Sequence, residues 1–137
     1  MSAPLIYVAT LRIMEGKLEG LKQYHKEVVE AFEAREPQLI AFHAFLNEDG
    51  TEMTVIQFHP DTASMDIHMK VLGQLLPEFA EKFGDVFEFI EPIHSAYYGT
   101  PSASALEMDR SLVESGVDLS LSLKPHHIGG FTRATAG

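Results

Sequence analysis

The stretch LIAFHAFLNEDGTEMTVIQFH, residues 39–59, decides the fold of this chain. It contains two runs rich in apolar, aromatic and β-branched residues, 39–46 and 53–59, which are typical of strands. Between the runs lie Asp49 and Gly50, a pair that favours the positive φ angles of a tight hairpin turn. The sequence therefore predicts an antiparallel hairpin at the centre of the fold.

The register of this hairpin decides where two histidines point. If Asp49 and Gly50 form a two-residue turn, the numbers of paired residues add up to 99, and His43 lies opposite Ile56. His43 and His59 then point to opposite faces of the sheet, because strand side chains alternate. A three-residue loop would place both histidines on one face. We favour the two-residue turn, and we expect His43, with its aromatic neighbours, to be more buried than His59.

A strand and a helix precede the hairpin. Residues 5–14 carry apolar side chains at both odd and even positions, which predicts a strand that is buried on both faces. From Lys17 onward the apolar residues recur at helical spacing. Glu36 and Pro37 end this predicted helix, because the residue before a proline avoids helical backbone angles.

A second helix follows the hairpin. Residues 60–62, Pro-Asp-Thr, are typical of a helix start, with Asp61 or its neighbouring threonine as the capping residue. We expect this helix to break and restart between Gly73 and Pro77. It should end near residues 83–84.

Residues 86–97 predict a fourth strand, in which Pro92 marks a bulge or an edge position. The resulting order is the split βαβ arrangement of ferredoxin-like folds. We therefore predict an α+β fold, a ferredoxin-like βαββαβ domain with a four-stranded antiparallel sheet, over residues 1–98. Residues 99–137 are predicted as a C-terminal extension that packs on this domain or on a partner. The expected elements of the extension are a short helix (105–114) and a strand (117–123).

A single four-stranded sheet has two faces, and two helices can cover only one of them. The apolar residues at both parities of strands 5–14 and 39–46 require that the second face be buried as well. A second copy of the chain is the simplest cover, so we predict a homodimer with its sheets packed face to face, a dimeric α+β barrel. Strand 117–123 is expected to cap a sheet edge, either of its own chain or of the partner.

The composition narrows the class of partner. Twenty acidic residues against ten basic ones give a net charge of -10, and binding to phosphate backbones depends on cations. We therefore expect no nucleic acid and no membrane as partners. The chain has no cysteine, which excludes disulfides and thiolate nucleophiles. Its start, Met1-Ser2-Ala3-Pro4, does not read as a signal peptide, so we expect a cytoplasmic protein.

His68 is the main candidate for catalysis. It shares a helix face with Met65 and Leu72, which points its imidazole toward the sheet. A buried imidazole that titrates near neutral pH can act as a general base. The alternative is a core histidine that is satisfied by one strand partner. His43 is the second catalytic candidate, because a strand histidine can share a cavity with His68.

Polar strand residues can line a pocket and bind substrate, and the candidates are Tyr7, Arg12, Gln57, His59 and His94. For Arg12, an ion pair with Glu88 or Glu91 is the alternative, because a lone charge inside a strand needs a partner or water. The many Met and Phe residues suit a pocket for a small apolar or aromatic molecule.

The sequence offers little for a metal or a bound cofactor. His59 and Asp61, with His68 or His94, match the bare pattern of two histidines and one carboxylate in iron sites. Asp61 has a competing role as a helix cap, so we expect no metal ligand here. Glycine-rich nucleotide-binding motifs are missing from the sequence, and we expect no cofactor.

The features quoted so far resemble the antibiotic biosynthesis monooxygenase-like proteins of the dimeric α+β barrel superfamily. They are the strand 5–14, Gly16-Lys17 opening a helix, Glu36-Pro37 before the next strand, the Asp49-Gly50 hairpin, and an inward His68. The resemblance covers about residues 5 to 98. It implies a dimer with a ligand cavity between sheet and helices, and oxygenation of quinol-like or polycyclic phenolic substrates without metal or flavin. The chain has no tryptophan, which sets it apart from the haem-degrading branch.

Three functions remain open at this point. The first is a cofactor-independent monooxygenase in which His68 deprotonates a phenolic substrate. The second is a non-oxidative isomerase of the same fold that uses the same histidine to move a proton. The third is a non-catalytic dimer that binds a small ligand, because a fold does not by itself imply a function.

Overall fold

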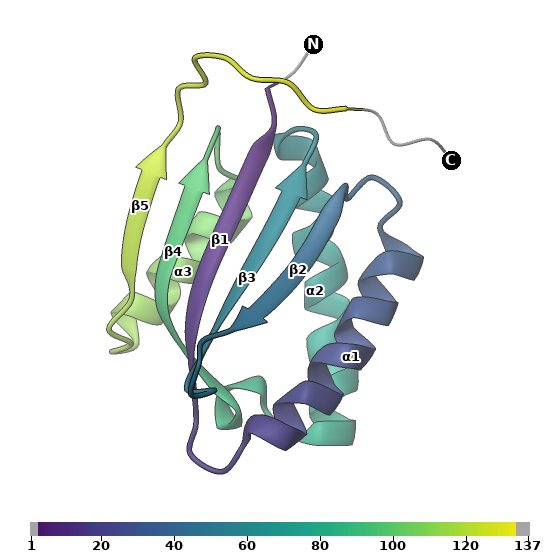
Figure 1. Ribbon diagram of the computed structural model, residues 1–137, viewed down its shortest axis with the longest axis vertical. Coiled ribbons are helices and arrows are strands. Elements are labelled where there is room, and N and C mark those ends of the chain that lie inside the picture. The colour runs from purple at the N-terminus through teal and green to yellow at the C-terminus, as the bar shows by residue number, and fades with distance from the viewer. Residues whose placement is uncertain (1–2, 134–137) are drawn as a thin grey trace.

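The computed structural model describes residues 3–133 and is built around one five-stranded sheet with the strand order β2-β3-β1-β4-β5. The pairs among the first four strands are all antiparallel, while β5 runs parallel to β4. Figure 1 shows the strands side by side, with the helices behind them. The elements are β1 (Leu5–Ile13), α1 (Leu18–Arg35), β2 (Ala41–Leu46), β3 (Glu52–His59), α2 (Thr62–Phe83), a 3-10 turn η1 (Val86–Glu88), β4 (Ile90–Tyr98), α3 (Ala103–Glu114) and β5 (Ser120–Lys124).

This element order confirms the α+β, ferredoxin-like βαββαβ core. The C-terminal extension adds a helix and a strand to it, so the sheet as a whole is mixed. The β5 strand pairs with β4 of its own chain, and the amide of Gly99 donates to the carbonyl of Lys124 over 2.9 Å. The strand of the extension therefore caps its own sheet. The division of the chain at residue 98 stays a prediction.

The hairpin between β2 and β3 has the predicted register. His43 pairs with Ile56, and in every pair of this ladder the two residue numbers add up to 99. The turn itself differs, because the amide of Asn47 donates to the carbonyl of Glu52 over 3.1 Å, which leaves four residues in the loop. The side-chain oxygen of Asn47 accepts hydrogen bonds from the amides of Thr51 and Glu52. A four-residue loop keeps the same parity as a two-residue turn, so His43 and His59 do point to opposite faces.

The second helix is longer than predicted. The expected break is wrong, because α2 continues through Gly73 and Pro77 to Phe83. A proline inside a helix loses one hydrogen bond and its ring crowds the residue four positions earlier. At Pro77 the crowded group is the carbonyl of Gly73, and the buried Leu75 and Val71 hold this part of α2 against the core. The predicted cap is confirmed, since the Asp61 side chain accepts a hydrogen bond from the amide of Ser64.

The fourth strand begins later than predicted and contains the predicted bulge. Residues 86–88 form the turn η1, which Asp85 caps by accepting from the amide of Phe87 over 2.9 Å. Along β1 the partner changes from His94 opposite Thr10 to Pro92 opposite Leu11, so Ile93 is an extra residue. The bulge lies beside Pro92 because proline cannot donate to the ladder.

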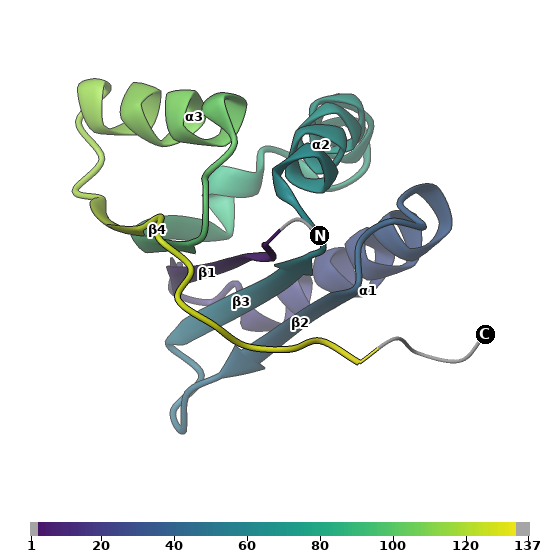
Figure 2. The ribbon, with the colours of Figure 1, turned by 90° about the horizontal axis from the view of Figure 1, so that it is seen from above.

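All three helices cover the same face of the sheet (Figure 2). On this face Met65, Leu5 and Tyr97 are almost completely buried, as are Phe32 and Leu75. The opposite face carries a group of apolar side chains that no helix of the described residues covers. Its members include Ile6, Val8, Ile56 and Phe58, with Phe45 at 61% and Tyr98 at 41% exposure. Among the helices within residues 3–133, none combines the length and apolar composition needed to cross a membrane.

We expect Gly99→Ala to lower the free energy of unfolding by about 3 kcal/mol, which is the upper end of the usual cost of backbone strain. Gly99 has a φ of +114°, and an added Cβ would lie 2.5 Å from the carbonyl oxygen of Pro4. The matched control is Gly116→Ala, at a φ of +104° with no atom within 4 Å, which should cost only about 1 kcal/mol. Denaturant unfolding measures both variants, and equal losses would show that the contact with Pro4 does not matter.

Candidate active site

The most buried charged group of the chain is the carboxylate of Glu36, and its partner is His68. Glu36 follows α1 directly, where its amide still donates to the carbonyl of Phe32. His68 lies in α2 and points toward the sheet, as predicted. Its Nδ1 atom lies 2.9 Å and 3.0 Å from the two carboxylate oxygens of Glu36, and both residues are only 2% exposed.

This pair fixes the orientation of the His68 ring. An ionised carboxylate can only accept hydrogen bonds, so Nδ1 of His68 carries the proton. In the neutral ring Nε2 is then the basic nitrogen, and no side chain or backbone group among residues 3–133 is hydrogen-bonded to it. No fully buried side-chain nitrogen or oxygen in the described part lacks a partner, so Nε2 retains some access to solvent. A carboxylate behind an imidazole with its second nitrogen free is the arrangement of a general base.

Aromatic rings form the walls around this base. The ring centroid of Phe32 lies 4.6 Å from that of His68, and the ring of Phe42 lies 6.3 Å away. Phe32 comes from α1 and Phe42 from β2, so α1, α2 and β2 all contribute to the site. The surroundings of His68 are therefore apolar apart from Glu36 and a second histidine.

That second histidine is His59, at the end of β3 and completely buried. Its Nδ1 shares a hydrogen bond of 2.7 Å with the hydroxyl of Ser64, and its Nε2 donates to the side-chain oxygen of Gln57 over 2.9 Å. Burial, and then the nearby His68, lower the pKa of His59 to about 4. His59 is thus neutral at physiological pH, and both of its nitrogens are engaged within the protein.

A second polar group lies further along the same face of the sheet. Tyr7 shares a hydrogen bond of 3.2 Å with Ser95, and the hydroxyl of Tyr97 donates to Asp109 of α3 over 2.5 Å. Burial raises the pKa of Tyr7 to about 12, and it also raises the pKa values of Tyr97 and Asp109. Tyr7 is the register partner of both Gln57 and Tyr97. Polar groups therefore form one row across three strands, from His59 and Gln57 to Asp109.

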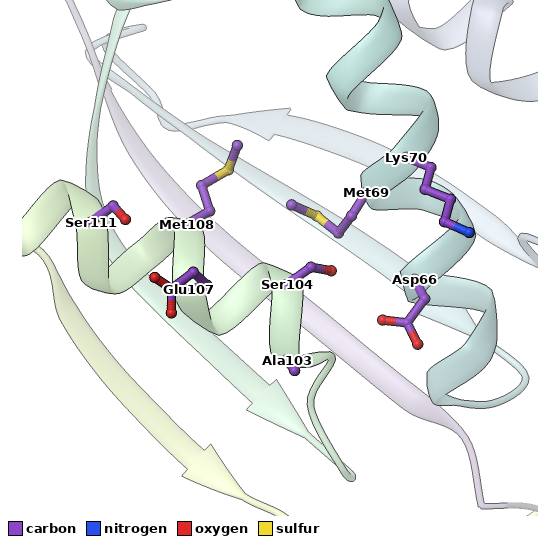
Figure 3. A pocket seen from close by; sticks show the side chains of 8 residues that line it. All are labelled: Asp66, Met69, Lys70, Ala103, Ser104, Glu107, Met108 and Ser111. Carbon is purple, nitrogen blue, oxygen red and sulfur yellow. The ribbon is translucent and has the colours of Figure 1, made fainter.

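A cavity of about 810 Å³ lies between α2 and α3. Figure 3 shows Met69 of α2 and Met108 of α3 pointing into the space between the two helices. Ala103 and a set of charged and hydroxyl side chains form the rest of its lining (Asp66, Lys70, Ser104, Glu107 and Ser111). Met69 also packs against the cluster of Leu5, Met65 and Tyr97 beneath it. The size is within the range of small-molecule sites.

The predicted site residues divide between the two faces of the sheet. His68, His59, Gln57 and Tyr7 lie together on the face covered by helices. The other three, His43, Arg12 and His94, lie on the uncovered face. His43 is exposed, so the expectation that it is more buried than His59 is wrong.

On the uncovered face, Arg12 forms an ion pair with Glu91 of the neighbouring strand, which was the alternative to substrate binding. The Nδ1 atom of His94 lies 2.5 Å from the hydroxyl of Ser120 on β5. Within residues 3–133, no group of three His, Asp or Glu side chains is placed to hold a metal ion.

Two residues of the site were not recognised in the sequence. In the sequence, Glu36 marks only the end of a predicted helix, and Asp109 lies only within a predicted short helix. Each of them finds its partner through tertiary structure, Glu36 at a distance of 32 residues along the chain and Asp109 at 12. The sequence near Glu36 carries no local pattern that would indicate His68.

We expect the free energy of unfolding to fall as the pH is lowered from about 6.5 to about 4. In this window the unfolded chain protonates His59 at its ordinary pKa of 6.5, whereas the folded chain, with a pKa of about 4, does not. The change attributable to His59 is on the order of 1–3 kcal/mol. Denaturant unfolding of wild type and His59→Gln over this range measures it. The variant should show a smaller slope, and His126→Gln, in the exposed tail, should behave as wild type.

We expect Tyr97→Phe to lower the free energy of unfolding by about 1–3 kcal/mol, because the buried Asp109 carboxyl loses a hydrogen-bond donor. The matched control is Tyr98→Phe, the next residue, which faces the uncovered side and is 41% exposed. Its loss should stay within about 0.5 kcal/mol. Thermal or denaturant unfolding distinguishes the two, and similar losses would contradict a stabilising role for the Tyr97–Asp109 bond.

Known structures share this fold. MupZ from Pseudomonas fluorescens aligns over 97% of this chain and 91% of its own, with a TM-score of 0.67 and 17% identity. A protein from Bacteroides thetaiotaomicron that is assigned to the antibiotic biosynthesis monooxygenases aligns over 64% of this chain and 79% of its own, with a TM-score of 0.51 and 17% identity. Protein SO0527 from Shewanella oneidensis aligns over 72% and 91%, with a TM-score of 0.55 and 21% identity.

No protein-family model and no curated protein sequence matches the chain. At these low identities the three similar structures establish the fold and nothing more specific. The similarity to MupZ extends over nearly the whole chain, so it includes the added helix and strand. The resemblance inferred from the sequence is confirmed at this level: the chain has the ferredoxin-like α+β fold of antibiotic biosynthesis monooxygenase-like proteins.

Proposed function

We propose that the chain is a monooxygenase that oxidises a small aromatic substrate of the quinol type, with His68 as the general base. The observation that carries this proposal is the Glu36–His68 pair. Glu36 holds Nδ1 of the imidazole with both carboxylate oxygens, and Nε2 is left free for a substrate. Nε2 of His68 is therefore placed to accept a proton from a substrate.

The chemistry needs no more than this base, the substrate and molecular oxygen. Nε2 of His68 takes a proton from the phenol or from the activated carbon next to its ring, which leaves an electron-rich anion. The anion transfers electrons to O2 and forms a carbon–oxygen bond, and the resulting peroxide anion takes the proton back from His68 to give a hydroperoxide. Loss of water from this hydroperoxide then yields the quinone. For an anthrone, one O2 is consumed for each anthraquinone and water formed.

The surroundings of His68 suit an aromatic substrate. Phe32 and Phe42 offer ring faces and edges on which a planar molecule can stack. The buried and neutral His59 stays in place through Ser64 and Gln57, so we assign it to positioning of the site. Tyr7 and Gln57 continue the polar row and are proposed to contact the polar end of the substrate.

The similar solved structures support the proposal. One of the similar structures is assigned to the antibiotic biosynthesis monooxygenases, and its fold matches the core of this chain. The same fold would also serve an isomerase or a ligand-binding protein. Oxygen consumption separates these possibilities, because neither alternative uses O2.

We also propose that two copies of the chain form a homodimer through the uncovered face of the sheet. Apolar side chains cover much of this face, and large exposed apolar patches mark interaction sites. His43, Arg12 and His94 lie on this face and would become part of the interface. His43, our second catalytic candidate, would then act only through contacts made across the dimer.

Oxygen uptake by the purified protein, with a panel of quinols and anthrones and without added metal or flavin, tests the proposal. We expect uptake together with formation of the quinone. His68→Ala should lower kcat by about 100-fold or more, the usual contribution of a general base. Glu36→Gln should lower kcat with little change in KM, because Glu36 orients the base and does not touch the substrate.

The matched control for Glu36→Gln is Glu33→Gln, an exposed residue of α1, the helix that Glu36 follows, and it should keep full activity. Uptake that is equal in wild type and His68→Ala would contradict the role of His68. Ligand-induced thermal stabilisation without any uptake across the panel would contradict the monooxygenase and favour a binding protein or an isomerase.

A further inference from the structure

We propose that residues 125–133 form an arm that binds a second copy of this chain, at the end of the sheet that carries the β2–β3 hairpin. This inference rests on the proposed homodimer and adds the surface and the orientation of the two copies. It is independent of the proposed chemistry. The observations that carry it are the exposure, the position and the charge of the arm.

The arm exposes side chains that proteins normally bury. It follows β5, contains no helix or strand, and all of its residues are exposed. Within it Ile128 is 101% and Phe131 is 82% exposed, the two most exposed large apolar residues in the described part of the chain. Burying a side chain of this size stabilises a complex or fold by about 1.5–3 kcal/mol. The backbone groups of the arm are also free of any sheet or helix.

The arm leaves the sheet on the side where a partner would sit. Figure 2 shows it passing the strands on the face opposite to the three helices. Figure 1 shows that it does so at the end of the sheet where β4 and β5 finish, while the β2–β3 loop lies at the other end. The arm therefore begins on the uncovered face, which is also the face of the proposed dimer.

The charge of the arm is opposite to that of the rest of the chain. Residues 125–133 contain Arg133 and two histidines, and no acidic residue. The remainder of the chain has nine cations against twenty anions. At the hairpin end of the sheet, Glu48, Asp49 and Glu52 are all exposed.

The basic arm and the acidic hairpin end can meet in one arrangement of two copies. If two uncovered faces pack with their strands running in opposite directions, the arm of each copy meets the acidic hairpin of the other. The contact occurs twice, as a two-fold symmetric interface requires. The apolar residues of the two faces fill the space between these ends, and Ile128 and Phe131 extend the apolar contact beyond the sheet.

The same arm is poorly placed to bind its own hairpin. The nine residues of β1 make the sheet face about 30 Å long. The nine residues 125–133 span about 30 Å only when fully extended. Reaching the acidic end of the same chain would leave no slack, and it would also cover the face from which the dimer is made. A second copy is therefore the occupant that fits both the reach and the charge.

Cross-linking of single-cysteine variants tests the contact, because the chain has no cysteine of its own. One population carries Thr132→Cys in the arm, and a second, mass-tagged population carries Glu48→Cys in the hairpin. After mixing and mild oxidation, we expect disulfide-linked pairs between the two populations. With the control Glu33→Cys, on the exposed surface of α1, linked pairs should form at least tenfold more slowly. Equal rates at Glu48 and Glu33 would overturn the proposal.

Light scattering over a range of concentrations provides the second readout. We expect the wild type to be a dimer, and the double variant Ile128→Ser with Phe131→Ser to dissociate at a concentration at least tenfold higher. Both residues are exposed in the single chain, so circular dichroism should show an unchanged fold. A monomeric wild type would overturn both the dimer and the arm. A dimer that is unaffected by the double variant would overturn the arm alone.

A disulfide within one chain carrying both Thr132→Cys and Glu48→Cys, formed at high dilution, would show that the arm binds its own hairpin and would also overturn the proposal. Oxygen uptake plays no part in these outcomes. Failure of the arm can thus be told apart from failure of the proposed enzymatic function.

Discussion

A carboxylate that is buried away from water needs hydrogen-bond donors as partners. The geometry of the whole site depends on the donors that surround Glu36. Its charge is held by His68 from the side of α2, and Gln38 donates a further hydrogen bond over 3.3 Å. Glu36 lies where α1 ends, so the position of this helix end, the rotation of α2 and the path of the chain toward β2 are all constrained by one hydrogen-bonded pair. A change in any of them would leave a buried charge without a partner, which is far more costly than the loss of an ordinary surface contact.

The polar row across the sheet extends this constraint to the added helix. Gln57, Tyr7 and Tyr97 are neighbours in register, and their polar groups connect His59 on one side with Asp109 of α3 on the other. The C-terminal extension is thus joined to the same buried layer as the proposed base. It also forms one wall of the cavity between α2 and α3. A family resemblance limited to the first 98 residues would have left out this part of the molecule.

The sequence predicts the elements that depend on local chemistry. The parity of the hairpin, the cap at Asp61 and the bulge beside Pro92 all follow from a few adjacent residues. The sequence does not predict contacts such as Glu36–His68, because the two residues meet only when separate elements pack. The error on His43 has a similar origin. Its parity relative to His59 was correct, but only the helices decide which face is buried, and they cover the face of His59.

The bulge at Ile93 changes which residues of β4 face the helices. Before it, Ile90 and Pro92 pair with Ile13 and Leu11 on the helix-covered face, and after it the odd-numbered residues Ser95 and Tyr97 occupy that face. One supernumerary residue therefore reverses the alternation in mid-strand. The same residues paired without a bulge would alternate unbroken and would turn Tyr98, in place of Tyr97, toward α3. The hydroxyl that meets Asp109 therefore owes its direction to a bulge four residues away.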